Sequence, residues 1–383
     1  MDNGKKILGV LPLLFGFFIM GFVDVVGVAT NYVKHDFMLS DSVANLLPMM
    51  VFVWFVLCSI PTGLLMGRFG RRNVVLLSIV ITAVAMLIPI VRYDYPCVLV
   101  AFALLGIGNT ILQVSLNPMV AAVVSSRRVA SVLTLGQFIK AVSSMLGPVI
   151  AGAVAAMYGD WKLIFVVYAV VSVVSMLWLL CGVKAENPSG SEQGAATMRS
   201  VIALCCNSRV VMLFFGIMCV VGLDVGLNVL IPQVLMVRTG MPLHEAGLGT
   251  SLYFLSRTVG ALIGAFMLTR ISSRSLLKWC MAVALVALVA LMLAWDLYVI
   301  VALVIILGLM CANVFSILFS MALELEPAKN DEVSALMIMG VSGGAMIPPV
   351  MGLLSDLGGV TSGIPLLIGC VVYICLLSFL KGK

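Results

Sequence analysis

The chain has 383 residues, of which 63% are hydrophobic and 10% charged, and its mean hydropathy is +1.23. A soluble globular domain is about 45–50% apolar and about 25% charged, so this composition excludes a water-soluble fold for most of the chain. The formal net charge of +6 comes largely from basic residues in short loops, so it indicates no nucleic-acid partner.

Long apolar runs recur along the whole chain. Runs of about 18–25 apolar residues are long enough to cross a bilayer as helices. Because many more follow the first run, it is not a cleaved signal peptide. The sequence predicts an all-α membrane protein with twelve transmembrane helices in two pseudo-symmetric six-helix halves. These helices are centred near residues 20, 55, 83, 109, 144, 172, 223, 257, 286, 308, 342 and 371.

One extended hydrophilic segment, "KAENPSGSEQGAATMRS" (184–200), divides the chain. Its Pro, Ser, Gly and mixed charges are typical of a flexible linker. We therefore expect an N-terminal six-helix half over residues 1–183, a cytoplasmic linker over 184–208, and a C-terminal six-helix half over 209–383.

The distribution of Lys and Arg predicts the orientation in the membrane, because cytoplasmic loops carry an excess of basic residues. With the N-terminus inside, nearly all loop and terminal Lys and Arg residues lie on the cytoplasmic side. The outer side holds Lys34, Arg92, Lys162 and Arg238. Both termini are therefore predicted to be cytoplasmic.

The two halves resemble each other in sequence. "PTGLLMGRFGRRNVVLL" (61–77) and "LIGAFMLTRISSRSLLK" (262–278) share a small residue, an apolar turn and a basic cluster, and "GPVIAGAVAAMYG" in span five resembles "PPVMGLLSDLGG" in span eleven. Two repeated six-helix halves are typical of a secondary transporter, whose site lies at the interface of the repeats near the middle of the membrane.

The segment "GLLMGRFGRR" (63–72) resembles the loop signature of the major facilitator superfamily, except that Gly67 stands where the family usually has Asp. The resemblance implies a charge network that closes the cytoplasmic side. We expect Arg68, Arg71 and Arg72 to take part, paired with acids of a cytoplasmic loop such as Glu324 and Glu326. Alternatively, these arginines only set the topology.

A narrower resemblance covers most of the chain. "VVGLDVGLNVLIPQVL", "SRTVGALIGAFMLTRISSRSLLK", "VSGGAMIPPVMGLLSDLGG" and the Asn117-Pro118 pair of "LLGIGNTILQVSLNPMV" resemble the fucose–galactose–glucose:proton symporter family. This resemblance implies a monosaccharide moved with a proton across the bacterial inner membrane. Fucose-transporting members carry a glutamate where this chain has Gln113, and the family's first-span acid matches a position near Gly27, about one turn after Asp24. Asp224 matches the family's span-seven acid better.

Four ionisable residues are predicted to lie well inside spans: Asp24, Lys140, Asp224 and Arg257. Charges inside a membrane are rare and usually face a bundle interior or an aqueous cavity, where they have functional roles. Two interpretations remain open. The four residues form ion pairs that hold helices together, or at least one acid carries the coupled proton. Burial favours the neutral carboxyl group and a nearby base favours the charged one, so an acid whose surroundings change can bind and release a proton. We favour Asp24 as the proton carrier, with Asp224 second.

Polar side chains within or near the ends of the spans are candidates for binding sugar hydroxyls, because amides both donate and accept hydrogen bonds. Their alternative role is hydrogen bonding between helices, which is common in membranes. The predicted substrate-binding residues are Asn109, Gln113, Asn117, Gln137, Lys140, Asn228, Arg257 and Asn313.

The sequence thus predicts a transporter that imports a monosaccharide by proton symport through alternating access, working as a monomer in the lipid bilayer. Two rivals remain: a proton-coupled antiporter that exports drugs or metabolites, and a symporter of an anionic sugar, which Lys140 and Arg257 would favour. No enzyme motif occurs in a span, and the ten cysteines lie in or beside apolar runs without metal-like spacing, so we expect no enzyme activity, cofactor, metal site or disulfide framework.

Overall fold

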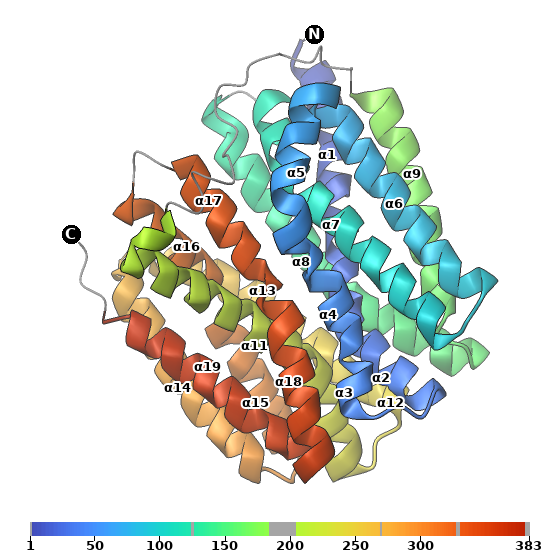
Figure 1. Cartoon of the computed structure of the whole chain (residues 1–383), viewed down its shortest axis with the longest axis vertical. Coiled ribbons are helices and arrows are strands. Elements are labelled where there is room, and N and C mark those ends of the chain that lie inside the picture. The colour runs from blue at the N-terminus through green and yellow to red at the C-terminus, as the bar shows by residue number, and fades with distance from the viewer. Residues whose placement is uncertain (1, 124–125, 184–203, 269, 327–329, 380–383) are drawn as a thin grey trace. The chain divides into compact units, whose positions relative to one another are not determined.

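The computed structural model describes residues 2–123, 126–183, 204–268, 270–326 and 330–379 (Figure 1), and every regular element among them is a helix. These residues include twelve helical stretches long and apolar enough to span a membrane, and each contains one of the predicted span centres. The predicted all-α membrane fold is confirmed.

The chain forms two compact units, Met1–Val25 with Trp54–Ala195, and Val26–Val53 with Ala196–Lys383. Residues 26–53 therefore pack with the later helices, although the sequence predicted them as part of the first half. The division at residue 183 stays a prediction, and the linker predicted over 184–208 lies outside the described residues as far as residue 203.

The first unit contains six main helices and one short 3₁₀ segment. They are α1 (Asp2–Met20), η1 (Gly21–Val25), α5 (Trp54–Phe69), α6 (Arg71–Val91), α7 (Tyr95–Val123), α8 (Ser126–Tyr158) and α9 (Leu163–Gly182). Helix α6 packs extensively against α7 and α9, and α8 packs against α1 and η1. Gly70, with a φ of 79°, allows the sharp turn between α5 and α6 that an L-residue would strain.

The second unit contains the remaining elements, several of which are interrupted spans. They are α2 (Val26–Asp36), α3 (Asp41–Ala44), α4 (Leu46–Phe52), η2 (Leu204–Cys206), α11 (Ser208–Thr239), α12 (Leu243–Ala246), α13 (Leu248–Met267), α14 (Ser273–Leu293), α15 (Leu297–Cys311), α16 (Val314–Leu325), α17 (Asn330–Met339), η4 (Gly340–Ser342), α18 (Gly343–Gly358), η5 (Val360–Gly363) and α19 (Ile364–Leu377). Helix α11 is central, because it contacts α2, α13, α16, α18 and α19.

Equivalent helices of the two repeats begin in the same way. The Asp94 carboxylate accepts a hydrogen bond from the backbone N–H of Cys97 at 2.9 Å, at the start of α7. The Asp296 carboxylate accepts from Tyr298 and Val299 at 3.0 and 3.1 Å, at the start of α15. An aspartate at this position satisfies N–H groups that have no partner inside the helix. This match is a structural trace of the internal repeat.

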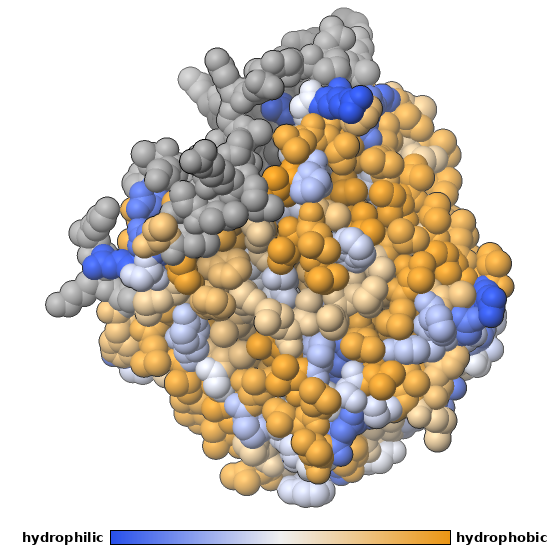
Figure 2. Space-filling view, viewed as in Figure 1, coloured by the Kyte–Doolittle hydropathy of each residue, from blue (hydrophilic) through white to orange (hydrophobic). Residues whose placement is uncertain are grey.

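The surface suits a lipid solvent. Large apolar side chains on the membrane-spanning helices are widely exposed, including Leu262 at 60%, Val286 at 69% and Leu376 at 62%. Figure 2 shows apolar residues over much of the viewed face, with few polar ones among them. Exposed apolar area on this scale is not found on monomeric soluble proteins.

Candidate substrate and proton site

The first predicted span changes from α-helix to 3₁₀-helix at Gly21–Val25, and Asp24 lies in this short segment. Gly21 allows the change to occur against α8. A Cβ atom at Gly21 would lie 2.6 Å from the Cβ of Ser143 and 2.7 Å from the carbonyl oxygen of Lys140. Because the two backbones approach so closely, the Asp24 side chain reaches residues of α8.

The Asp24 carboxylate accepts a hydrogen bond of 2.5 Å from the hydroxyl of Ser144. The same hydroxyl also lies 3.0 Å from the backbone carbonyl of Lys140, one turn earlier in α8. A hydroxyl has a single hydrogen to donate, so it can bond only one of these acceptors at a time. The three groups therefore form a hydrogen-bonded chain that has two possible directions.

A row of amide side chains lies along α7 in the same unit. Asn117 donates to the backbone carbonyl of Gln113 at 3.5 Å, and the Gln113 amide donates to the Asn109 side-chain oxygen at 2.7 Å. Asn109 is buried and donates to the carbonyl of Met20 at 2.8 Å, immediately before the 3₁₀ segment. Backbone carbonyls at such a junction need partners outside the regular helix, and Asn109 supplies one. Gln113 and Asn117 are only half-buried.

The second predicted acid, Asp224, lies in the unbroken helix α11 and has different partners. Its carboxylate accepts a hydrogen bond of 2.6 Å from the hydroxyl of the fully buried Tyr253 and forms an ion pair with Arg257. Both partners lie on α13, four residues apart and so on one helix face. The side chains of Asp224 and Arg257 are 17% and 28% exposed, so the pair is largely shielded. The predicted ion-pair alternative is therefore found at Asp224.

The other predicted substrate residues take separate places. Asn228 is buried on α11 against α2, where any side chain at Gly27 would collide with it. Asn313 donates to the backbone carbonyl of Gly260 at 2.8 Å, between spans ten and eight. Gln137 on α8 is exposed and Lys140 is half-buried. Asn313 thus has a structural hydrogen bond, and the binding roles of this group stay predictions.

The predicted cytoplasmic gate residues have local contacts. Arg72 donates to the carbonyl of Leu180 at 2.8 Å, near the C-terminal end of α9, where a cation also stabilises the helix dipole. Arg68 lies over the ring of Phe69, and Glu326 accepts from the side chain of Asn207 at 2.8 Å. Arg71 is half-exposed and Glu324 is exposed. Their role in a gate stays a prediction.

Sequence reasoning missed four residues that the structure brings into these networks: Ser144, Tyr253, Asp41 and Asp356. Ser144 and Tyr253 carry no charge, and serine and tyrosine are ordinary residues within spans. Asp41 and Asp356 were assigned to loops, yet Asp41 is buried and both belong to helices. A signal existed only for the two aspartates, because acids are uncommon so close to apolar spans.

Comparison with known proteins identifies the family. The sequence model of the Major Facilitator Superfamily matches residues 13–225 and 213–382. A glucose/galactose transporter of Brucella abortus is 23% identical over 389 residues, covering 96% of this chain and 92% of that protein. Crystal structures of the E. coli fucose:proton symporter FucP and of the nucleoside transporter NupG match with TM-scores of 0.69 and 0.79, at 15% and 13% identity, and each comparison covers 98% of both chains.

These matches agree with the repeated six-helix plan and with the sequence motifs that predicted it. The structural matches show the fold, and the family match extends over nearly the whole chain. The chain therefore belongs to the Major Facilitator Superfamily, a family of membrane transporters and not of enzymes.

Proposed function

We propose that this protein imports a monosaccharide together with a proton, by alternating access, with Asp24 as the proton carrier. The observation that carries the proposal is the chain from Asp24 through the Ser144 hydroxyl to the Lys140 carbonyl. When Asp24 is ionised, Ser144 donates to it. When Asp24 is protonated, its O–H donates to the Ser144 oxygen, and the Ser144 hydrogen turns to the Lys140 carbonyl.

Both protonation states of Asp24 are thus fully hydrogen-bonded without a change of helix position. This matters because an unsatisfied buried polar group costs about 1–3 kcal/mol. A carboxyl group that is satisfied in either state can bind a proton from one side and release it to the other at modest cost. Asp224 is in a different situation, since its ion pair with Arg257 favours the charged form. We assign Asp224 a structural or substrate-positioning role in the cycle.

The proposed substrate is a neutral hexose-like sugar. The Brucella relative is described as a glucose/galactose transporter, and FucP as a fucose:proton symporter. In this chain, the half-buried Gln113 and Asn117 are the best candidates to bind sugar hydroxyls, because Asn109 and Asn313 already bond backbone carbonyls. An anionic sugar is less favoured, because Arg257 is already paired with Asp224.

We further propose that the protein works as a monomer in a bacterial inner membrane with both termini in the cytoplasm, as the distribution of basic residues predicts. The gate assigned to Arg68, Arg71 and Arg72 with Glu324 and Glu326 remains part of this proposal.

The test is an uptake panel with purified protein in liposomes, using labelled neutral sugars, acidic sugars and cationic drugs, with and without an imposed pH difference. We expect uptake of at least one neutral monosaccharide that is driven by an inward proton gradient. Uptake of acidic sugars alone would favour the anionic symporter. Failure of every sugar, combined with proton-driven drug movement in the opposite direction, would overturn the proposal in favour of the exporter.

A further inference from the structure

Residues 26–53, which we call the 26–53 hairpin, contain α2, α3 and α4 and belong to the second compact unit. Within that unit, α2 packs on α11, while α3 and α4 pack on α18 (Figure 1). The hairpin is covalently continuous with α1 and α5, which belong to the first unit. It is therefore the part of spans one and two whose packing partners differ from those of the rest of the same spans.

Both ends of the 26–53 hairpin coincide with interruptions in the helices. At one end, the 3₁₀ segment Gly21–Val25 precedes α2, and at the other, Val53 separates α4 from α5. A 3₁₀ stretch inside a longer helix often marks a hinge. The proton-carrier candidate Asp24 lies in the first of these interruptions.

The tip of the hairpin is held to α18 by a carboxylate. The two oxygens of Asp356 accept hydrogen bonds from the backbone N–H groups of Asp41 and Ser42 at 2.6 and 2.9 Å. The helices touch here because Gly352 has no side chain, and a Cβ atom there would lie 2.6 Å from the Asp41 carbonyl oxygen. Further along, the ring of Phe52 packs against Gly344 of the same helix in the same way.

A second polar contact joins the hairpin to α11. One oxygen of the buried Asp41 accepts hydrogen bonds from Lys34 at 2.6 Å and from the side chain of Gln233 at 2.8 Å. Asn31 donates to the carbonyl of Val229 at 3.0 Å. Lys34 comes from the hairpin itself, so it stabilises the charge of Asp41 whether or not Gln233 is in contact.

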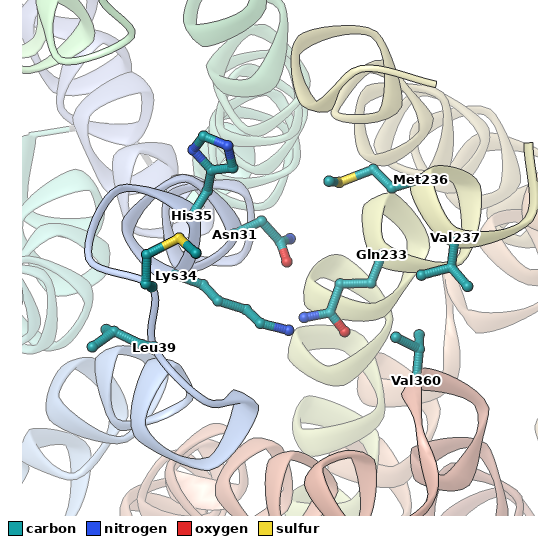
Figure 3. A pocket seen from close by; sticks show the side chains of 9 residues that line it. Asn31, Lys34, His35, Leu39, Gln233, Met236, Val237 and Val360 are labelled. Atoms are coloured by element: carbon teal, nitrogen blue, oxygen red, sulfur yellow. The ribbon is translucent and has the colours of Figure 1, made fainter. Parts of the chain in front are cut away.

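Water can reach this contact. A cavity of about 300 Å³ is lined by Asn31, Lys34 and Gln233, together with apolar residues of α2, α11 and η5. Figure 3 shows the amino end of Lys34 and the amide of Gln233 turned toward each other at its edge. Hydrogen bonds beside a solvated cavity can be exchanged for bonds to water at a small net cost, so the contact can open and close repeatedly.

We propose that the 26–53 hairpin is a moving gate, hinged at Gly21–Val25 and at Val53, and that Asp356 and Asp41 are the positioning residues that hold it closed. This rests on the proposed transport function, because alternating access requires such a surface to open in each cycle. With Asp24 in one hinge, protonation and gate position act on the same short segment.

The test measures gate opening without any substrate. A single cysteine reporter, Leu47→Cys, is placed on α4, where Leu47 is fully buried, and its labelling by a membrane-impermeant maleimide is followed in proteoliposomes. Asp356→Ala should increase the labelling rate about five- to thirtyfold, the effect of losing a helix-capping carboxylate. Asp356→Asn should have an intermediate effect, since one amide oxygen still accepts. Protein without the reporter gives the background from native cysteines.

Two controls separate gating from general loosening. Asp296→Ala removes a carboxylate that caps α15 in the same unit and should leave labelling of Leu47→Cys unchanged. A second reporter, Leu288→Cys, is equally buried on α14, which packs on α15, α16 and α19, and should not respond to Asp356→Ala. If both reporters respond equally, or neither does, the gate is refuted.

A lock completes the test. Ser42→Cys with Asp356→Cys, joined by a reducible bifunctional thiol reagent, should abolish counterflow of the transported sugar, and reduction should restore it. Continued transport by the joined protein would overturn the gate even if the uptake panel had established the transport function. A failed panel with responsive labelling would refute only the function.

Discussion

The two membrane-embedded acids, Asp24 and Asp224, occupy similar places in the two repeats but have different structural surroundings. Asp24 lies in a 3₁₀ break of span one and accepts a hydrogen bond from a neutral hydroxyl. Asp224 lies in a continuous helix and is bonded to a tyrosine and an arginine. A repeated sequence can thus place equivalent acids and still give them different chemistry, because the partners come from other helices.

The largest expected effect separates the two acids directly. Asp24→Asn should remove proton-driven accumulation, because an amide cannot carry the proton, while sugar counterflow persists. An imposed difference of one pH unit is worth about 1.4 kcal/mol per proton and should support about tenfold accumulation by the parent protein. Accumulation ratios in liposomes would measure this.

Asp224→Asn is the matched variant for the same measurement. It should slow transport without abolishing its response to the pH difference. If Asp224→Asn removes the response and Asp24→Asn keeps it, the assignment of the two acids must be exchanged.

The ion pair of the second unit should matter more for stability than for coupling. Asp224→Ala leaves the Arg257 charge without its partner, and breaking a fully buried pair costs about 3–5 kcal/mol. Because these side chains are 17% and 28% exposed, we expect about 2–3 kcal/mol, seen as a lower thermal unfolding midpoint in detergent. The double variant Asp224→Asn with Arg257→Gln should recover part of this loss. No recovery would mean that the charges do not interact.

The close helix approach beside each acid gives a smaller contrast. Gly21→Ala places a methyl group against the backbone carbonyl of Lys140, which has little freedom to move, and should cost about 1–3 kcal/mol. Gly222→Ala meets the side chain of Ile347, which has more freedom to adjust, so the cost should be smaller. Gly63→Ala has open space and is the control. Equal destabilisation at Gly21 and Gly63 would contradict the close approach.

The smallest effect concerns the start of α7, outside the membrane-spanning segments. Hydrogen bonds from the thiol and then the backbone N–H of Cys97 hold the pKa of Asp94 below its ordinary value, and Arg92, whose side chain lies 2.5 Å from the carboxylate, lowers it further. Because the folded pKa is the lower one, this stabilisation is present above the unfolded pKa of about 3.9 and is lost as the pH falls through the folded pKa.

Asp94→Asn should therefore remove a small part of the acid sensitivity of the unfolding midpoint below about pH 4. Unfolding midpoints of the parent and variant across that range would show it. Parallel curves for the two proteins would contradict the role assigned to this carboxylate.

Much of the fold could be predicted from the sequence. Runs of apolar residues identified all twelve spans, since hydropathy is a local property that needs no knowledge of neighbours. The motifs "GLLMGRFGRR" and "VSGGAMIPPVMGLLSDLGG" indicated the family that the comparison confirms. The two acids stood out because charge is rare inside a span.

Only the tertiary structure decided what those residues contact. Ser144 is 120 positions from Asp24, and Asp356 is 315 positions from Asp41, so no periodicity or spacing relates them. The same holds for residues 26–53, whose apolar character predicts a span but not the helices on which they pack. The sequence determined which segments enter the membrane and where charge must be buried. Hydrogen bonds and ion pairs between distant segments depend on how the helices are packed, and they give each charge its role.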